Sequence, residues 1–415
     1  MRFTKLITLR RQVVPSDKMK LIVAGAVTLF LVLALHTTTK KRSITPPFVH
    51  MRHGHGVTLG SLVVAPKFNQ KEAMKDMKQI QLNILRDFIG KDLPPWLDSS
   101  LNQTLPALGS PLLPNQVRRV LIVTTWRSGS TFLGDLINNW PGTFYYFEPL
   151  RFISENSEVP AMLEASSSAL LRTLLSCSLD QRHLPFLQYI TSARNNFMIR
   201  HNHRATPLCR KVGACMDPSL HSLACSLHPM VLAKAVRLPL HAAVTLLKDR
   251  DLNLHVIHLV RDPRGVLKSR TRMPWCKSSS CSNLETVCHA INRDAVTSKR
   301  LRSEFPNQYL LLRYEDLAQR PFPMTRRIFE FLNLPLMPEL AIFLDQHTNQ
   351  QAAMNSNKDG YSYGSLYNTY RNSSVASSAW RTSITPELAR EVNPSCMDKM
   401  AIYDEYLLIT YIYHL

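Results

Sequence analysis

The polar segment 124–131 carries the residue types best suited to chemistry, and it lies between an apolar run and an amphipathic stretch. Arg127 supplies a forked positive charge, and Gly129 lets the backbone approach a ligand closely. Further hydroxyl donors come from Ser128, Ser130 and Thr131. A loop that opens a helix also presents free backbone N–H groups at the positive end of the helix dipole. The segment therefore predicts an anion site, although a serine-rich helix start can also be a simple cap.

The spacing within this loop argues against a nucleotide kinase of the Walker type. Such a kinase needs G-x-x-x-x-G-K-[ST], in which the lysine reaches the phosphates and the hydroxyl holds Mg²⁺. Here the basic residue Arg127 precedes the glycine, and no such lysine follows it. We therefore expect a phosphate group that is held and not transferred.

The elements that must position this loop begin near residue 117, where short apolar runs alternate with helical patterns. This alternation is typical of β-α-β units and a parallel sheet. The predicted strands are 120–124, 143–147, 235–238, 254–260 and 309–312. The predicted helices include 130–140, 263–271, 284–303 and 324–332. Residues 155–232 are interpreted as an insertion that serves as a lid or an acceptor-binding segment.

Glu148 is the candidate general base, and it follows the predicted strand 143–147. Successive strands of right-handed parallel units end at the same edge of a sheet, where ligands bind. Glu148 and Arg127 should therefore converge. A carboxylate beside an anion site suits a base that takes a proton from an attacking hydroxyl. A helix cap or a salt-bridge partner is the equal alternative.

A second anion site is predicted after the strand 254–260. Arg261 ends that strand at the same edge as Arg127, and Ser269 in the following helix could face the strand end. Asp262 can cap that helix, with a proline at its first position. Two anion sites on one sheet edge imply a ligand with phosphates at both ends.

The amino terminus predicts a membrane anchor. Residues 21–35 are apolar and free of charge, and they have six basic residues before them and three soon after. We expect a cytosolic tail 1–20, a transmembrane signal-anchor 21–36, a stem 37–116 and a lumenal domain 117–415. A cleaved signal peptide is the alternative, but His36 stands where a small residue should precede the cut. The short span suits the thin bilayers of the early secretory pathway.

Glycosylation sequons and cysteines bear on the compartment of the chain. Sequons at Asn102 and Asn372 and an even set of eight cysteines fit a lumenal chain with disulfide bonds.

Residues 67–88 are predicted to form a helix that docks on the main domain, and the pairing of two such stems into a homodimer is the alternative. One set of residues resembles a metal site but matches no standard zinc spacing, so no metal is predicted: His201, His203, Cys209 and Cys215.

The formal net charge of +20 is typical of a protein with a polyanionic partner, and a solvated basic surface is the equal alternative. Anionic lipid, nucleic acid and acidic polysaccharide all meet this condition. A lumenal domain encounters little nucleic acid, and no nucleic-acid recognition motif appears in the sequence. We therefore expect no nucleic-acid partner.

Together these segments resemble the Golgi carbohydrate sulfotransferases, in particular the galactose/N-acetylglucosamine/N-acetylgalactosamine 6-O-sulfotransferase family. The stretch TWRSGSTF (125–132) is similar to that family's loop for the 5′-phosphosulfate of PAPS (3′-phosphoadenosine 5′-phosphosulfate). The stretch VIHLVRDPRGVLKSR (256–270) is similar to its 3′-phosphate site. LRYEDLAQRP (312–321) and SAWRTSI (378–384) are similar to later family segments.

The resemblance implies the PAPS-dependent sulfotransferase fold, an α/β fold in which helices flank a P-loop-like parallel β-sheet. It implies a single-pass type II protein of the Golgi membrane, with PAPS as co-substrate, no metal, and a glycan or glycosaminoglycan acceptor. The implied cofactor-binding residues are Arg127, Ser128, Gly129, Ser130, Thr131, Phe132, Arg261 and Ser269.

The implied reaction is transfer of a sulfuryl group to the 6-hydroxyl of a sugar. Glu148 would be the base, and Arg127 would neutralise charge on the departing phosphate oxygen. N-acetylglucosamine is the first choice of acceptor sugar, with galactose or N-acetylgalactosamine as alternatives. A catalytically inactive lumenal glycan- or PAPS-binding protein of the same fold is the alternative function.

Overall fold

The computed structural model describes residues 70–88, 91–104, 108–156, 160–205, 214–276, 279–349, 369–383 and 396. The predicted cytosolic tail and membrane anchor lie outside these residues. None of the helices in the described part combines the length and the hydrophobicity that a membrane span requires.

A parallel sheet lies at the centre of the described chain, and its strand order is β2-β3-β1-β4-β5. The strands are β1 (Arg118–Thr124), β2 (Thr143–Phe147), β3 (Met230–Ala235), β4 (Leu254–Val260) and β5 (Tyr309–Arg313). Nearly all their residues are buried. This burial explains why the strands read as continuous apolar runs, since helices cover both faces of the sheet.

Four of the five predicted strands are confirmed, with ends that move by no more than two residues. The predicted strand 235–238 is wrong, because β3 is Met230–Ala235 and the chain has left the sheet by Val236. The charged Lys234 interrupts the apolar run, so the pattern favoured the stretch that follows it. That lysine is buried because the structure supplies it with a charged partner, as described below.

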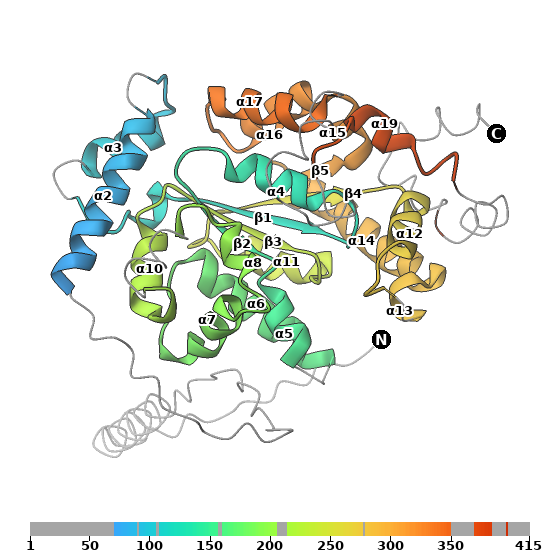
Figure 1. Cartoon of the computed structure of the whole chain (residues 1–415), viewed down its shortest axis with the longest axis horizontal. Helices are drawn as coiled ribbons and strands as arrows, with labels where there is room; N and C mark the ends of the chain where they lie inside the picture. The colour runs from blue at the N-terminus through green and yellow to red at the C-terminus, as the bar shows by residue number, and fades with distance from the viewer. Residues whose placement is uncertain are drawn as a thin grey trace, which may run out of the picture. The chain divides into compact units, whose positions relative to one another are not determined.

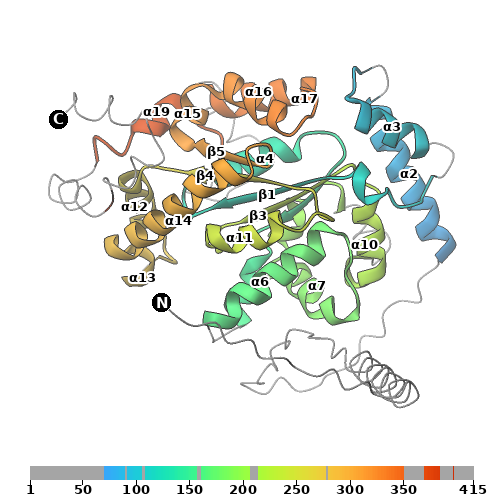
Figure 2. The same ribbon diagram turned by 180° about the vertical axis from the view of Figure 1, so that it is seen from behind.

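Helices cover the two faces of the sheet in separate layers (Figures 1 and 2). One layer contains α6 (Pro160–Leu175), α11 (Leu240–Leu247) and α14 (Leu284–Glu304). The opposite layer contains α4 (Ser130–Asn138), α16 (Pro321–Phe331) and α17 (Pro338–Thr348). Among the described residues, the remaining helices of eight residues or more are α2 (Gln70–Phe88), α3 (Pro95–Thr104), α7 (Leu184–Thr191), α10 (Pro218–Ser226) and α12 (Pro263–Thr271).

The predicted helices are confirmed with small changes at their ends. Helix α12 has the predicted bounds, and α14 is one residue longer. Helix α4 ends at Asn138, two residues early, and α16 begins at Pro321, three residues early. Proline is favoured in the first turn of a helix, where its missing N–H has no partner to lose.

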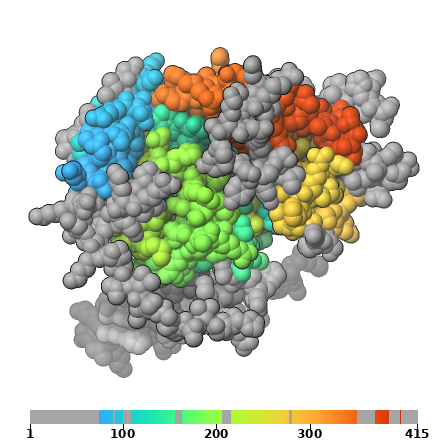
Figure 3. All heavy atoms as spheres, in the orientation of Figure 1, coloured from blue at the N-terminus to red at the C-terminus, as the bar shows by residue number. Residues whose placement is uncertain are grey.

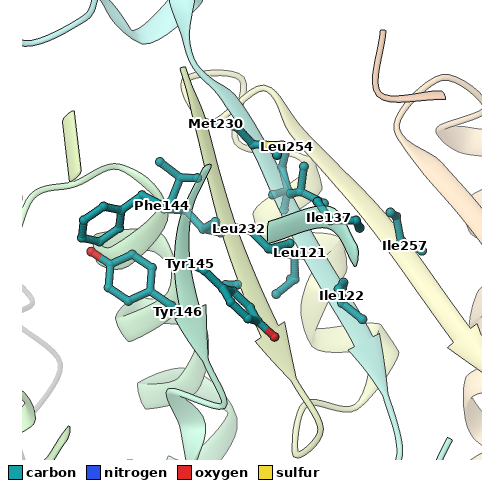
Figure 4. Close-up of a cluster of buried hydrophobic side chains, with 14 of the residues drawn as sticks. Leu121, Ile122, Ile137, Phe144, Tyr145, Tyr146, Met230, Leu232, Leu254 and Ile257 are labelled. Atoms are coloured by element: carbon teal, nitrogen blue, oxygen red, sulfur yellow. The ribbon is translucent and has the colours of Figure 1, made fainter. Parts of the chain in front are cut away.

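The core forms where α4 packs on the sheet. Figure 4 shows Leu121 of β1, Leu232 of β3 and Ile137 of α4 among the buried side chains that meet there. All three are fully buried. Because these side chains interdigitate, the carboxyl ends of β1 and β3 and the start of α4 are held in fixed relative positions.

Helix α2 packs onto this same core. Met77, Ile84 and Phe88 lie on its buried face and belong to the hydrophobic cluster that contains the strands. The Phe88 ring lies 5.1 Å from the ring of Trp140, which follows α4. The prediction that this helix docks on the main domain is confirmed. In Figure 3 its atoms, drawn in blue, lie beside those of α4 and of the segment between β2 and β3.

The segment between β2 and β3, which includes most of the predicted insertion, consists mainly of helices joined by turns in its described part. It contains α5 (Leu150–Asn156), α6, α7, α8 (Phe197–Arg200) and α10. A disulfide bond between Cys177 and Cys225 joins the end of α6 to α10.

The prediction that cysteines pair is confirmed. Two further disulfide bonds join Cys276 to Cys281 and Cys288 to Cys396. Cys215 is also disulfide-bonded. The Cys288–Cys396 bond attaches the carboxyl-terminal part of the chain to α14.

Candidate active site

The loop between β1 and α4 is built around Gly129, the N-cap residue of α4, which has a φ of 87°. Left-handed backbone of this kind suits glycine, and no side chain caps the helix at this position. The first N–H groups of α4 therefore remain available to an anion. Ser128 and Ser130 are buried on either side, and the Ser128 hydroxyl lies 3.0 Å from that of Thr125.

The two predicted anion sites meet directly. Arg127 Nε donates a 2.9 Å hydrogen bond to Ser269 Oγ on α12, and Arg261 Nη1 donates a 2.9 Å hydrogen bond to the Arg127 carbonyl oxygen. Residues that are far apart in the sequence therefore form one continuous set of donors at the carboxyl ends of β1 and β4. The prediction that Arg261 lies at the same sheet edge as Arg127 is confirmed, while the roles of these residues toward a ligand remain a prediction.

Tyr314 holds this set together, and the sequence analysis did not single it out. Its ring lies under the Arg261 guanidinium, with 4.2 Å from the guanidinium carbon to the ring centroid. A Cβ atom added at Gly129 would come within 2.4 Å of the same ring. The segment LRYEDL was noted for its resemblance, but nothing in its local pattern shows that its tyrosine reaches the β1–α4 loop.

Replacing Gly129 by alanine should therefore damage both anion sites together. The new methyl group must displace the Tyr314 ring, and Arg261 loses the ring that supports it. Left-handed backbone also costs about 1–2 kcal/mol in a residue with a side chain. We expect weaker binding of PAP, the desulfated form of PAPS, by at least about tenfold, measured by calorimetry.

The matched control is Gly109→Ala. Gly109 also has a positive φ, of 89°, but its added Cβ would meet only the flexible side chains of Lys78 and Met74. This variant should show the backbone cost in its Tm without a change in PAP affinity. Equal PAP affinity in both variants would contradict the proposed coupling through Tyr314.

Glu148 lies at the predicted sheet edge and forms two ion pairs. Its Oε1 is 3.1 Å from Lys234 Nζ, and its Oε2 is 3.1 Å from Arg237 Nη1. Burial acts to raise the pKa of Glu148, but attraction to these two cations outweighs it, and the pKa of the carboxyl lies below its ordinary value. The residue is thus held ionised, in left-handed backbone with a φ of 47°. The salt-bridge alternative is therefore realised, and it is compatible with service as a proton acceptor.

Lys234 connects this carboxylate to the anion loop. Its side chain is fully buried, and Nζ donates a 3.3 Å hydrogen bond to Thr131 Oγ1 at the start of α4. Nζ also lies 3.6 Å from the centroid of the Phe147 ring. Lys234 and Arg237 were missed in the sequence because β2 is an edge strand next to β3, and only the strand order shows which residues face Glu148. The available signal was a single lysine inside the apolar stretch MVLAKA.

The sequence of the chain is similar to those of known sulfotransferases. A model of the sulfotransferase domain matches residues 117–404. The chain belongs to the sulfotransferase family. Carbohydrate sulfotransferase 1 of Mus musculus is 29% identical over 375 residues, covering 78% of this chain and 89% of that protein. Carbohydrate sulfotransferase 3 of Mus musculus is 30% identical over 329 residues, covering 69% and 67%.

A solved mouse sulfotransferase in complex with PAP aligns with a TM-score of 0.38 at 12% identity, covering 75% of this chain and 93% of that one. Similarity this remote says nothing about the ligands of the present sulfotransferase. The residues themselves must show whether a bis-phosphorylated ligand suits the site.

The donor set of this sulfotransferase has the chemistry that such a ligand requires. Arg127, Arg261 and Ser269 offer guanidinium and hydroxyl donors, which match phosphate oxygens. Within the described part of the chain, Arg261 Nε is buried and has no hydrogen-bond partner. Buried donors are rarely left without a partner, so this N–H is available to a phosphate oxygen. Phe132 lies apart from this contact, and its ring packs 5.6 Å from that of Phe343 on α17.

Two residues of the rejected metal site, His201 and Cys215, lie in structural contacts. Among the described residues, no group of three or more His, Cys, Asp or Glu side chains is arranged to hold a metal ion. His201 stacks on the Phe147 ring at 3.8 Å and contacts Asp135 Oδ1 at 3.1 Å. Cys215 is disulfide-bonded. Both residues therefore have structural roles that account for their presence.

Proposed function

We propose that this sulfotransferase transfers a sulfuryl group from PAPS to the 6-hydroxyl of a sugar in a glycan or proteoglycan chain. The observation that carries the proposal is the contact between the two anion sites, through Arg127 Nε and Ser269 Oγ, beside an ionised carboxylate. A ligand with phosphates at both ends is thereby presented next to a proton acceptor. Relatives whose names state a carbohydrate acceptor support the sugar as substrate.

The residues divide the work as follows. The β1–α4 loop with Arg127 would bind the 5′ end of PAPS, and Arg261 with Ser269 would bind the 3′ phosphate. A sugar oxygen attacks sulfur and forms the new O–S bond, while the bond between sulfur and the phosphate oxygen breaks. Glu148 accepts the proton of the hydroxyl, and PAP leaves. Arg127 and the α4 N–H groups stabilise the charge that develops on the departing phosphate.

The acceptor and the compartment belong to the same proposal. N-acetylglucosamine is the preferred acceptor, with galactose and N-acetylgalactosamine as the alternatives. The net charge of +20 suits an acidic or already sulfated glycan. We place the enzyme in the Golgi membrane as a type II glycoprotein, and the disulfide bonds agree with an oxidising compartment.

The test uses the secreted chain from residue 43 onward with radiolabelled PAPS. Acceptors ending in N-acetylglucosamine, galactose or N-acetylgalactosamine are offered side by side, and the position of the label is read after digestion. Label at the 6-position of one sugar names both reaction and substrate. PAP binding without label on any acceptor would support the inactive binding protein, and absence of PAP binding would refute the proposal.

The pH dependence of the reaction should follow the ion pairs of Glu148. Because the pKa of Glu148 lies below its ordinary value, kcat/KM should be constant at neutral and mildly acidic pH and fall only as the pH drops through that lowered pKa. In Lys234→Met, one stabilising cation is lost while burial remains. The pKa of Glu148 should therefore rise, and the acid limb should move to higher pH.

The measurement is kcat/KM from about pH 4 to pH 8. Lys248→Met, at the exposed end of α11, is the matched control and should keep the parent profile. An acid limb that does not move in Lys234→Met would show that Glu148 is not the titrating base.

A further inference from the structure

Two tryptophan rings form a partly exposed surface beside the site. Trp275 lies between α12 and the short helix α13 (Ser279–Ser282), and its side chain is 46% exposed. The ring of Trp126 lies 5.7 Å from it, edge to face, at an angle of 71°. We call these two rings the tryptophan platform. Of the five tryptophans, all within the described residues, only Trp275 ranks among the exposed large hydrophobic residues.

Hydrogen bonds and a disulfide bond anchor the backbone around the platform. Buried Arg270 donates one hydrogen bond to the Trp126 carbonyl oxygen, at 3.3 Å, and another to the Cys281 carbonyl oxygen, at 2.9 Å. The disulfide bond from Cys276 to Cys281 closes the loop that begins directly after Trp275. These bonds hold the backbone on both sides of the platform, and the exposed Trp275 ring packs on Trp126, although exposure of a large aromatic side chain costs solvation free energy.

A chain of contacts leads from the platform to the proposed base. The Arg237 guanidinium lies over the Trp126 ring, 5.1 Å from its centroid, and the same guanidinium donates to Glu148 Oε2. Trp126 also directly precedes Arg127 in the anion loop. The platform thus adjoins the place where the attacking hydroxyl must lie. Helices α12 and α13 stand at the carboxyl end of the sheet (Figures 1 and 2), and yellow atoms from this part of the chain form part of the surface in Figure 3.

We infer that the tryptophan platform binds a sugar ring of the acceptor next to the ring that is sulfated. This inference rests on the proposed function. A pyranose ring has an apolar C–H face and a polar rim, which match a rigid aromatic face bordered by arginine. Tryptophan combines a large contact area with little conformational freedom to lose, so it suits this task. Trp275 then determines acceptor specificity, because an oligosaccharide contacts the platform and a monosaccharide does not.

The experiment compares a monosaccharide glycoside with a trisaccharide that ends in the same sugar. Each is assayed with PAPS and the full chain, including its amino-terminal segment. Trp275→Ala should raise the KM for the trisaccharide about tenfold. The KM for the monosaccharide and the KM for PAPS should stay within about twofold of the parent. Trp275→Phe should restore most of the trisaccharide affinity, because it retains an aromatic face.

Two controls keep the outcomes distinct. Phe322→Ala removes an aromatic ring of similar exposure on α16 and should change no KM. Trp275→Leu retains apolar volume without a flat face. It should raise the KM for the trisaccharide about tenfold, and it provides this measurement if the alanine variant folds poorly. Unchanged trisaccharide KM in Trp275→Leu would overturn the inference, and so would a raised KM for PAPS, which would place the nucleotide base on the platform. A parent enzyme that labels no acceptor would instead refute the proposed function.

Discussion

Replacing Glu148 by glutamine is expected to lower kcat by about 10²–10⁴-fold, the usual contribution of a general base. The amide retains the shape of the side chain and an oxygen for Lys234 Nζ, but it cannot accept a proton from the sugar hydroxyl. The anion sites on the β1–α4 loop and α12 are untouched, so PAP affinity should remain within about threefold of the parent. The measurement is kcat with saturating acceptor, together with PAP binding by calorimetry.

The stability of this variant needs a separate measurement, because Lys234 is fully buried. Removing the partner of a buried charge costs roughly 3–5 kcal/mol, and the oxygen that glutamine retains should keep the loss below that range. Glu330→Gln, the same change on the exposed surface of α16, is the matched control and should alter neither kcat nor Tm. A Glu148→Gln enzyme with parental kcat would show that another group accepts the proton.

Replacing Arg127 by alanine should lower kcat by about 10²–10³-fold, the effect of losing one preorganised donor to a developing oxyanion. The guanidinium also positions Ser269 through the 2.9 Å bond from Nε to Oγ, so the binding of PAP should weaken as well. Arg127→Lys should recover only part of the activity, because an ammonium group cannot make forked contacts to phosphate.

The hydrogen bond between Arg127 and Ser269 also predicts how their substitutions combine. Residues in direct contact are energetically coupled, so the effects of Arg127→Ala and Ser269→Ala on PAP affinity should not add in the double variant. Arg326→Ala, on the exposed surface of α16, is the matched control for loss of one positive charge. Additive losses of PAP affinity would mean that the two sites act independently.

The parts of the site that the sequence predicted are those with local signals. The β1–loop–α4 and β4–α12 units each combine an apolar strand, a polar turn and a helix start in consecutive residues. The resemblance rested on these two segments together with 312–321 and 378–384. The position of the two units at one edge followed from the rule that parallel strands end at a common edge, whereas the direct bond between Arg127 and Ser269 is seen only in the structure.

The parts that were missed depend on contacts between distant segments. Lys234 and Arg237 face Glu148 because β3 lies between β1 and β2, and no local pattern gives this strand order. The predicted position of β3 was wrong for the same reason. A buried lysine in a strand is stable only when it has a charged partner, and the sequence does not show that Glu148 is the partner of Lys234. Tyr314 belongs to a segment that begins after β5, and only the packed structure brings its ring against Gly129.

The backbone of the two charged residues has a consequence for engineering this enzyme. Arg127 and Glu148 have φ values of 71° and 47°, in the left-handed region where side chains cost about 1–2 kcal/mol. Glycine at either position would relieve this cost and remove the charge. At Glu148 the loss of the carboxylate that pairs with buried Lys234 would outweigh this gain, so selection for thermal stability alone should favour glycine only at Arg127 and yield a protein with little activity. Directed evolution of the enzyme would therefore need an activity screen at every round to retain the Arg127 guanidinium, whereas the buried ion pair itself selects for the charge of Glu148.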